Sequence, residues 1–433
     1  MVRFVLFAQP GLSSARARST SCPVPSPQVF VFLDDLDVEM GSSSPEYMPV
    51  LHSLVASQGA TFSRMYASVP VCCPSRSSLY SGQYQHNTRV MGNAVSTNCS
   101  SLAWQAGPET RTFAVPLRAA GYETFFAGKY LNDYGGPAVG GTAHIPPGWH
   151  HWQGLVGNSA YYNFTMSNNG TREPHGATPA DYLPTIIRER TLAFIDTAAA
   201  ASAPFFAYMS FPSCHGPQEA EAKYQGLYPD AKAPRTPNYN FTVPTAHWLQ
   251  AVQAVYGLDD NSAAFADLVY RRRLQTLASV DDAIAAVVGK LTALGLLDNT
   301  YIIVSVRAVP DAAVAARRAH PAARTPPPPL PSRAPVAPAQ ADNGFHTGTF
   351  GLIYDKRQPW ETDTHLPLFV RGPGIAPGVT VPAVVTMPDL ASTFLDMAGL
   401  PAPAHFDGTS WLPWAVGAGA GATPPARAAT LVE

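Results

Sequence analysis

The chain has 433 residues and a formal net charge of −2 at neutral pH. That length can hold one large α/β domain, or two domains, with a sizeable core. The near-neutral charge argues against nucleic acid or an anionic membrane surface as a partner, and no apolar run reaches the roughly 20 residues of a membrane span.

Residues 1–27 are rich in Ser, Arg and Pro and show no apolar periodicity. We expect a disordered or processed segment there. Four Asn-x-Ser/Thr sequons follow, with acceptor amides at Asn98, Asn163, Asn169 and Asn240. They predict a glycoprotein of the secretory pathway, either lysosomal, vacuolar or extracellular.

Buried strands and amphipathic helices alternate along the chain. Apolar runs rich in β-branched and aromatic residues predict strands at residues 28–33, 204–211, 300–305 and 366–370. Apolar residues at helical spacing predict helices at residues 281–294 and 387–399. The alternation predicts an α/β fold with a mostly parallel central sheet flanked by helices. Such sheets bind ligands at the carboxyl ends of their strands, where polar clusters follow Leu33 and Phe211 and surround Asp342.

Residues 306–340 break this pattern. They are rich in Ala, Pro and Arg and cannot bury enough apolar surface to order themselves. We expect a disordered insert and interpret it as a translated, retained intron whose removal would join Ser305 to Ala341. The codons fit splice sites, since Val306 must begin with GT and Gln340 can be encoded by CAG. The alternative is a genuine low-complexity surface insertion.

Carboxylates and an amide follow two of the predicted strands. Asp34 and Asp35 are adjacent, with no Lys or Arg near them in sequence, and such a pair suits a hard divalent cation. An Asp-rich turn or a helix cap is the alternative. Asp342 and Asn343 add oxygen ligands of the kind that Ca²⁺ or Mg²⁺ prefers, although Asp-Asn-Gly is also a common turn.

The chain resembles the sulfatases of the alkaline-phosphatase superfamily. The resemblance is carried by VCCPSRSSLYSGQYQHN, TFFAGKYLNDYG, SVDDAIAAV, DNGFHTG, DKRQPWETD and VRGPGI. It is strongest to the N-acetylglucosamine-6-sulfatase branch and to algal arylsulfatases. It implies a sulfatase core in two parts, residues 28–305 and 341–433. Relatives continue into a smaller C-terminal subdomain, so we expect the second part to be truncated.

The resemblance also implies a modified cysteine and one bound Ca²⁺. In sulfatases, the formylglycine-generating enzyme oxidises the first cysteine of Cys-x-Pro-Ser-Arg, which is Cys72 here, with Cys73 at the variable position. Arg76 would then hold the formylglycine hydrate. The implied metal ligands are Asp34, Asp35, Asp342, Asn343 and the residue derived from Cys72.

Further residues are implied to handle the sulfate group. Lys129 and Lys356 match sulfate-binding lysines, and His215 matches the histidine beside the leaving-group oxygen. Many sulfatases carry a histidine where this chain has Leu131, a substitution that the glucosamine-6-sulfatase branch shares. The base for sulfate release is therefore unassigned, with His346 as our candidate.

These residue types suit sulfate-ester hydrolysis. A hydrated aldehyde has two hydroxyl groups, of which one attacks sulfur and the other then expels sulfate. The two lysines and Ca²⁺ stabilise the sulfuryl oxygens, and His215 protonates the departing oxygen. The expected substrate is 6-sulfated N-acetylglucosamine or a similar sulfated sugar. The alternatives are a broad arylsulfatase acting on aryl sulfates, a phosphonate or phosphodiester hydrolase, and an inactive product whose metal loop is split by the insert.

Overall fold

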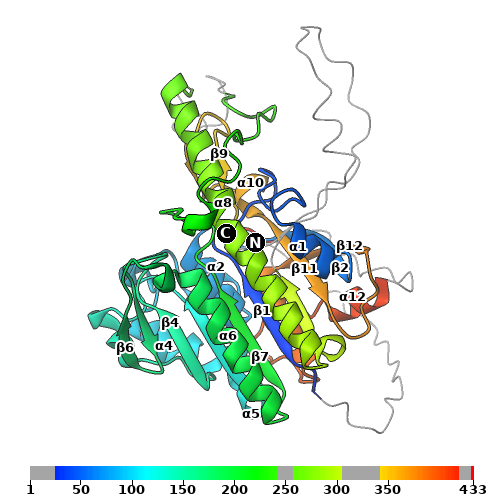
Figure 1. Ribbon diagram of the computed structural model, residues 1–433. Helices are drawn as coiled ribbons and strands as arrows, with labels where there is room; N and C mark the ends of the chain where they lie inside the picture. The colour runs from blue at the N-terminus through cyan, green and yellow to red at the C-terminus, as the bar shows by residue number, and fades with distance from the viewer. Residues whose placement is uncertain (1–24, 242–256, 305–341, 419–430) are drawn as a thin grey trace, which may run out of the picture.

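A computed structural model describes residues 25–241, 257–304, 342–418 and 431–433 (Figure 1). Ten strands form one sheet. In spatial order they are β12 (Val379–Thr386), β2 (Ala60–Tyr66), β11 (His365–Arg371), β8 (Tyr301–Val304), β1 (Gln28–Phe32), β7 (Phe205–Ser210), β3 (Glu123–Lys129), β4 (His151–Leu155), β5 (Thr165–Asn168) and β6 (Thr171–Pro174). A separate antiparallel pair joins β9 (His346–Thr347) to β10 (Tyr354–Asp355).

The centre of the large sheet is parallel, and its flanks are mixed. Strands β8, β1, β7, β3 and β4 run parallel to one another, as does β12 to β2. Strand β11 runs antiparallel to both β2 and β8, and β5 runs antiparallel to β4 and β6. Strand β11, which corresponds to the strand predicted at residues 366–370, is therefore one of the antiparallel members of this mixed sheet. The chain before β11 stays at the carboxyl edge of the parallel strands, so β11 starts at that edge and runs back.

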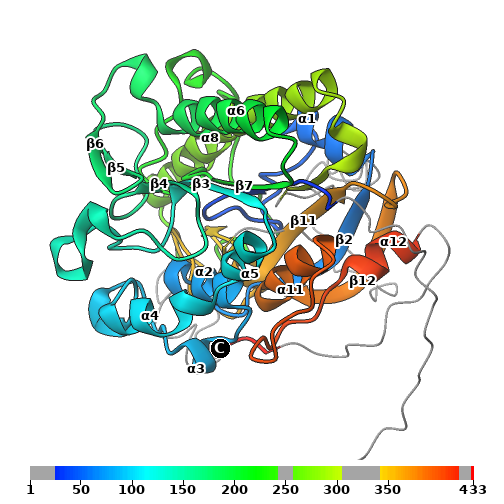
Figure 2. The same ribbon diagram turned by 90° about the horizontal axis from the view of Figure 1, so that it is seen from below.

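Helices cover both faces of this sheet (Figure 2). One face carries α1 (Pro49–Leu51), α6 (Leu183–Ala200) and α8 (Asp260–Ala293). The opposite face carries α2 (Cys72–Ser81), α5 (Ala114–Ala119) and α11 (Met387–Met397). The remaining described α-helices are short, namely α3 (Gln85–Thr88), α4 (Leu102–Ala106), α10 (Glu361–Thr364) and α12 (Leu412–Ala418). The structure thus confirms an α/β fold with a large central sheet between helical layers.

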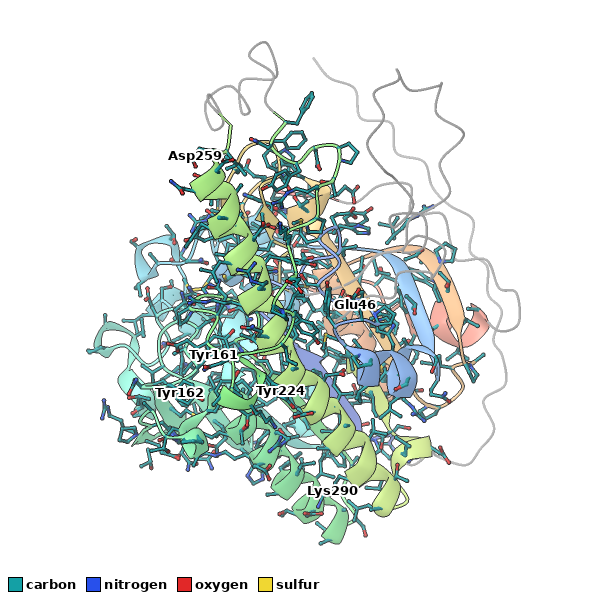
Figure 3. The ribbon with its side chains drawn as sticks, turned by 45° about the horizontal axis from the view of Figure 1, so that its top comes forward. Glu46, Tyr161, Tyr162, Tyr224, Asp259 and Lys290 are labelled. Atoms are coloured by element: carbon teal, nitrogen blue, oxygen red, sulfur yellow. A yellow bond between two sulfur atoms is a disulfide. The ribbon has the colours of Figure 1, made fainter. Side chains whose placement is uncertain are left out.

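The long helix α8 differs most from the sequence-based prediction, which placed only residues 281–294 in a helix. It starts 21 residues before Asp281, at Asp260, where the Asp259 side chain accepts a hydrogen bond from Ser262 N at 2.7 Å. Asp259 and Lys290 mark its two ends in Figure 3. The buried face of its first half includes Asp267 and Arg273, so the apolar stripe is interrupted there and periodicity alone missed it.

The predicted segments without periodicity fall largely outside the described residues. This holds for residues 1–24 and for the proposed intron at 306–340. Residues 25–27 contact the core, since Tyr122 donates to Ser26 O at 3.0 Å and Tyr301 N donates to Pro27 O at 2.9 Å. Within the described part of the chain, none of the helices combines the length and apolar character that a membrane crossing requires.

Candidate functional site

The predicted site residues meet at the carboxyl edge of the parallel strands. Asp34 and Asp35 follow β1, and Lys129 is the last residue of β3. His215 follows β7, and Asp342 is the first described residue after β8. Because β8, β1, β7 and β3 are parallel neighbours, their carboxyl ends bring these side chains together from distant parts of the sequence.

Helix α2 delivers the two remaining motif residues. Cys72 is its first residue, Pro74 lies in its first turn, and Gly82 ends it in the left-handed conformation with φ 66°. Every side chain from Cys72 to Ser81 is buried. The amino end of the helix therefore places Cys72 at the site, where the helix dipole favours negative charge, while Cys73 N donates to Asn93 Oδ1 at 2.9 Å.

Arg76, one turn further along α2, contacts residues at the carboxyl ends of four strands, β8, β1, β3 and β7. Its Nε donates to Asp342 Oδ2 at 2.8 Å, and its Nη2 lies 3.3 Å from Asp34 Oδ1. Its Nη1 donates to Lys129 O at 2.9 Å and to Ser210 Oγ at 3.0 Å. With a fully buried guanidinium, Arg76 fixes the ends of β3 and β7 and neutralises carboxylates beside Cys72.

The two predicted lysines lie within the same cluster. Lys129 Nζ donates to Asp34 Oδ2 at 2.6 Å. Lys356 Nζ donates to Asp35 Oδ1 and lies 3.1 Å from Cys72 Sγ. Both ammonium groups therefore face carboxylates, and Lys356 also reaches the Cys72 thiol.

The three buried carboxylates ionise unequally. Burial opposes ionisation of Asp34, but the charges of Lys129, His215 and Arg76 outweigh it and hold the pKa of Asp34 well below its usual range. Asp35 behaves similarly, since the charge of Lys356 overcomes burial and lowers its pKa. Burial and the nearby Asp34 charge raise the pKa of Asp342 well above its usual value.

This donor set fits a hard divalent cation. One oxygen or sulfur atom from each of Asp34, Cys72 and Asp342 lies within 4.8 Å of the other two. Asn343 Nδ2 donates to Asp35 Oδ1 at 2.8 Å, while its buried Oδ1 has no hydrogen-bond partner among the described residues. Carboxylate and amide oxygens are the ligands that Ca²⁺ prefers, and a cation among them favours ionisation of Asp342.

The two predicted histidines differ in their surroundings. His215 is partly exposed, its Nε2 lies 3.9 Å from Asp35 Oδ2, and its Nδ1 lies 2.7 Å from Gly216 O. Burial lowers the pKa of His215 even though Asp35 opposes that shift. His346 is fully buried, with Nδ1 2.9 Å from Asp363 Oδ1, and its Nε2 has no hydrogen-bond partner among the described residues.

A cavity of about 700 Å³ adjoins the cluster. His346 and Lys356 line it, together with Tyr354, Asp355 and Gln358. Lys356 thus lines this cavity and also contacts Cys72 Sγ in the buried cluster.

Sequence reasoning missed several groups that support the site. Ser159 donates to Asp34 Oδ2, Asp363 orients His346, and Arg273 donates to the backbone of Asp35. It also missed the disulfide between Cys73 and Cys99, which leaves Cys72 and Cys214 as the free cysteines of the described chain. No local spacing signals these contacts, because each joins residues far apart in sequence.

The predicted glycosylation acceptors lie at the surface to different degrees. Asn163, Asn169 and Asn240 are exposed. Asn98 is half-buried, and its Nδ2 donates to Arg89 O at 2.9 Å.

Two family models match the chain. The model described as Sulfatase matches residues 28–305, which is more than half of the chain. The model described as N-sulphoglucosamine sulphohydrolase, C-terminal, matches residues 348–422.

Curated relatives span both matched regions. The N-acetylglucosamine-6-sulfatase of Homo sapiens is 39% identical over 388 residues, which cover 89% of this chain and 63% of the relative. The extracellular sulfatase SULF-1 homolog of Drosophila melanogaster is 38% identical and covers 89% of this chain and 31% of the relative. The arylsulfatase of Volvox carteri is 31% identical, with 86% and 55% covered. The chain therefore spans less than two thirds of the length of these relatives.

Solved structures share the fold. One, a protein in complex with its substrate D-glucosamine-2-N,6-O-disulfate, has a TM-score of 0.68 at 19% identity and covers 93% of this chain and 82% of that chain. The phosphonate monoester hydrolase of Silicibacter pomeroyi has a TM-score of 0.63 at 21% identity, with 93% and 78% covered. At these identities the likeness establishes the architecture, whereas the family-model match and the curated relatives establish the family. The chain belongs to the sulfatase family.

Proposed function

We propose that this protein hydrolyses sulfate esters at the cluster around Cys72. The observation that supports this most is the burial of one thiol among three carboxylates, two lysines and one arginine, with Lys356 Nζ 3.1 Å from Cys72 Sγ. This set combines a nucleophile precursor, a cation-binding group of oxygens and positive charges for an anionic ester.

Each residue has a proposed part in the reaction. Cys72 is the position that the formylglycine-generating enzyme converts to formylglycine, whose hydrate supplies the attacking hydroxyl. Asp34, Asp35, Asp342, Asn343 and the modified Cys72 would hold Ca²⁺, which would supply positive charge beside the nucleophile. Arg76 orients residue 72 through the carboxylates that it contacts, and Lys129 and Lys356 bind the sulfuryl oxygens.

Proton transfer is proposed to involve the two histidines. His215 is partly exposed at the edge of the cluster, where a departing sugar oxygen can approach, and we assign it the general-acid role. Its lowered pKa disfavours the protonated form in the free protein, and the charge of a bound sulfate ester opposes that effect. His346 is our candidate base, since Asp363 holds one ring nitrogen and leaves Nε2 to accept a proton.

The proposed substrate is a sugar sulfated at the 6 position of N-acetylglucosamine, or a similar sulfated sugar. It rests on the 39% identity to N-acetylglucosamine-6-sulfatases. A broad arylsulfatase is the second candidate, and the 31% identity to the Volvox carteri arylsulfatase favours it. The sugar would occupy the cavity of about 700 Å³ beside Lys356. A secretory, lysosomal or extracellular location agrees with the sequons and the modifying enzyme.

A substrate panel on the purified full chain tests this proposal. The protein is produced with the formylglycine-generating enzyme, and conversion at Cys72 is quantified by peptide mass spectrometry. We expect turnover of N-acetylglucosamine-6-sulfate in proportion to conversion. Faster turnover of aryl sulfates than of the sugar sulfate would favour the second candidate. Fully converted protein that hydrolyses none of the sulfate esters would contradict the proposal.

A further inference from the structure

Arg273 of α8 is a buried cation with no part in the proposed chemistry. Its side chain is 1% exposed, and its Nη2 lies 2.7 Å from Asp37 Oδ2, which is fully buried. A buried ion pair contributes little more to stability than apolar side chains of similar size would, because the cost of desolvating the charges offsets their attraction. The contacts of its guanidinium therefore call for a different explanation.

These contacts reach three segments that supply the candidate site. Nη2 donates to Asp35 O at 2.6 Å, and Nη1 lies 3.5 Å from Cys214 O, the residue before His215. The guanidinium also stacks over the Phe345 ring at 4.0 Å, two residues after Asn343. One side chain thus supports the chain behind Asp35, His215 and Asn343 without touching the reacting atoms.

The backbone conformation of Asp35 depends on its contact with Arg273. Asp35 has φ 61°, a left-handed conformation that is uncommon outside glycine and costs about 1 kcal/mol or more. Three contacts hold it there: its N–H donates to Asp342 Oδ1 at 3.1 Å, and its C=O accepts from Arg273 and from Cys214 Sγ at 3.6 Å. This conformation points the Asp35 carboxylate at Lys356 and Asn343.

The second loop is tied to the first. Asp34 N donates to Ser213 O at 2.8 Å, and Cys214 N donates to Asp34 O at 2.6 Å. In each of the two paired loops, Arg273 contacts the carbonyl of the following residue, which is Asp35 O in one loop and Cys214 O in the other. A planar guanidinium can serve both directions at once, whereas the single ammonium of a lysine cannot.

We infer that Arg273 is a positioning residue that fixes the Asp35 and His215 loops in the geometry required to bind the divalent cation. The inference rests on the proposed function for its chemistry, but its consequence is a metal affinity that can be measured without turnover. Residues that orient metal ligands typically alter affinity by about 10- to 100-fold when they are replaced.

The test compares Arg273→Met, Arg273→Lys and a control, Arg235→Met, in the full chain. Arg235 also contacts α8 and makes the same two kinds of contact, an ion pair with Asp267 at 2.8 Å and stacking over Tyr239 at 4.0 Å. Each protein is stripped with chelator, and Ca²⁺ is titrated by calorimetry, with the Ca²⁺-induced shift in Tm as a second readout.

We expect Arg273→Met to weaken Ca²⁺ binding by about 10- to 100-fold, Arg273→Lys to give an intermediate loss, and Arg235→Met to leave it unchanged. In converted protein, kcat should fall more than KM rises. Folded Arg273→Met with the affinity of the parent chain would overturn the inference. If that variant does not fold, folded Arg273→Lys with unchanged affinity would overturn it equally.

Failure of the proposed function gives a different pattern. A parent chain that binds Ca²⁺ but hydrolyses no sulfate ester, with affinity still lost in Arg273→Met, would remove the proposed activity and leave the positioning role supported. A parent chain that hydrolyses sulfate esters but binds no Ca²⁺ would overturn the positioning role and leave the activity standing.

Discussion

Buried charge is balanced residue by residue around Cys72. Arg76 contacts Asp34 and Asp342, Lys129 contacts Asp34, and Lys356 contacts Asp35. Removing one member leaves its partner charged and buried, which typically costs about 3–5 kcal/mol. Variants of this cluster must therefore be checked for folding before a loss of activity is assigned to chemistry.

Replacement of Cys72 tests whether this side chain supplies the proposed nucleophile or only fills space in the core. We expect Cys72→Ala and Cys72→Ser to lose turnover, since neither can supply an aldehyde hydrate with two hydroxyl groups. Activity is assayed on the purified variants. Turnover in Cys72→Ala at the parent rate would contradict the nucleophile assignment.

Replacement of one carboxylate tests the proposed metal. We expect Asp342→Asn to weaken Ca²⁺ binding by at least about tenfold, because it removes a charge from the oxygen cluster and from Arg76. Asp267→Asn, which alters an ion pair on α8, serves as the control. Chelation should abolish activity and Ca²⁺ should restore it. Restoration by Zn²⁺ but not by Ca²⁺ or Mg²⁺ would count against an all-oxygen calcium site.

Among the secondary-structure elements, sequence patterns predicted the strands and helices with apolar buried faces and missed the helical segment with charged residues on its buried face. The runs at 28–33 and 204–211 correspond to β1 and β7, because strands buried on both faces are continuously apolar. The helix predicted at 387–399 corresponds to α11, which a Thr386–Asp389 capping box begins. The first half of α8 was missed because its buried face includes Arg273, whose partners lie in distant loops.

Helix α8 also contains an acid that should make stability depend on pH. Asp281 accepts hydrogen bonds from Val50 N and Leu51 N, but burial raises its pKa to about 6. Its folded-state pKa exceeds its unfolded value, so its contribution to stability is present below about pH 4 and declines as pH rises through 6. The change amounts to roughly 2–3 kcal/mol.

We expect Asp281→Asn to remove this slope. The variant should be less stable than the parent chain near pH 4.5, since an amide offers one acceptor fewer, and the difference should shrink or reverse by pH 7. Urea unfolding at several pH values measures it. Asp282→Asn is the control, because the Asp282 side chain is 40% exposed. An identical slope in Asp281→Asn and the parent chain would refute the prediction.

The proposed intron can be tested by deleting residues 306–340 as one segment. Val304 pairs with Val31 of β1, and Asp342 accepts from Asp35 N, so the described chain on both sides of residues 306–340 reaches one edge of the sheet. Deleting the segment joins Ser305 to Ala341 and should tighten Ca²⁺ binding, since closing a loop of that length costs roughly 3 kcal/mol. Equal affinity with and without it would contradict this effect. Full-length transcripts that always contain the segment would contradict the intron.

For the whole molecule, the sequence predicted which side chains gather at the carboxyl edge of the sheet, but not the contacts among them. Motifs and resemblance named Asp35, Asp342 and Lys356, and the edge rule for parallel sheets placed polar clusters together. That Lys356 reaches both Asp35 and Cys72 depends on the antiparallel return of β11 and the short β9–β10 pair. Such contacts follow from the path of the chain, which local patterns do not encode.

Surface exposure predicts which sequons carry glycans. We expect glycans at Asn163 and Asn169, whose side chains are exposed, when the protein is made in a secretory host. The half-buried Asn98 should be occupied least, because its amide bonds to Arg89 O. Glycosidase treatment with peptide mass spectrometry gives the occupancy of each site, and Asn163→Gln should remove one glycan. Unmodified Asn163 and Asn169 in secreted protein would refute this prediction.

The complete burial of Cys72 bears on the order in which its modification and the folding of the chain would take place. In the folded chain its thiol lies beneath Lys356, and its neighbour Cys73 is already joined to Cys99. A second protein cannot reach a side chain enclosed in this way. The proposed conversion of Cys72 would therefore have to precede the packing of helix α2 onto the sheet. Chains that fold before conversion would keep an unmodified Cys72, and they would have to unfold before the enzyme could act on it.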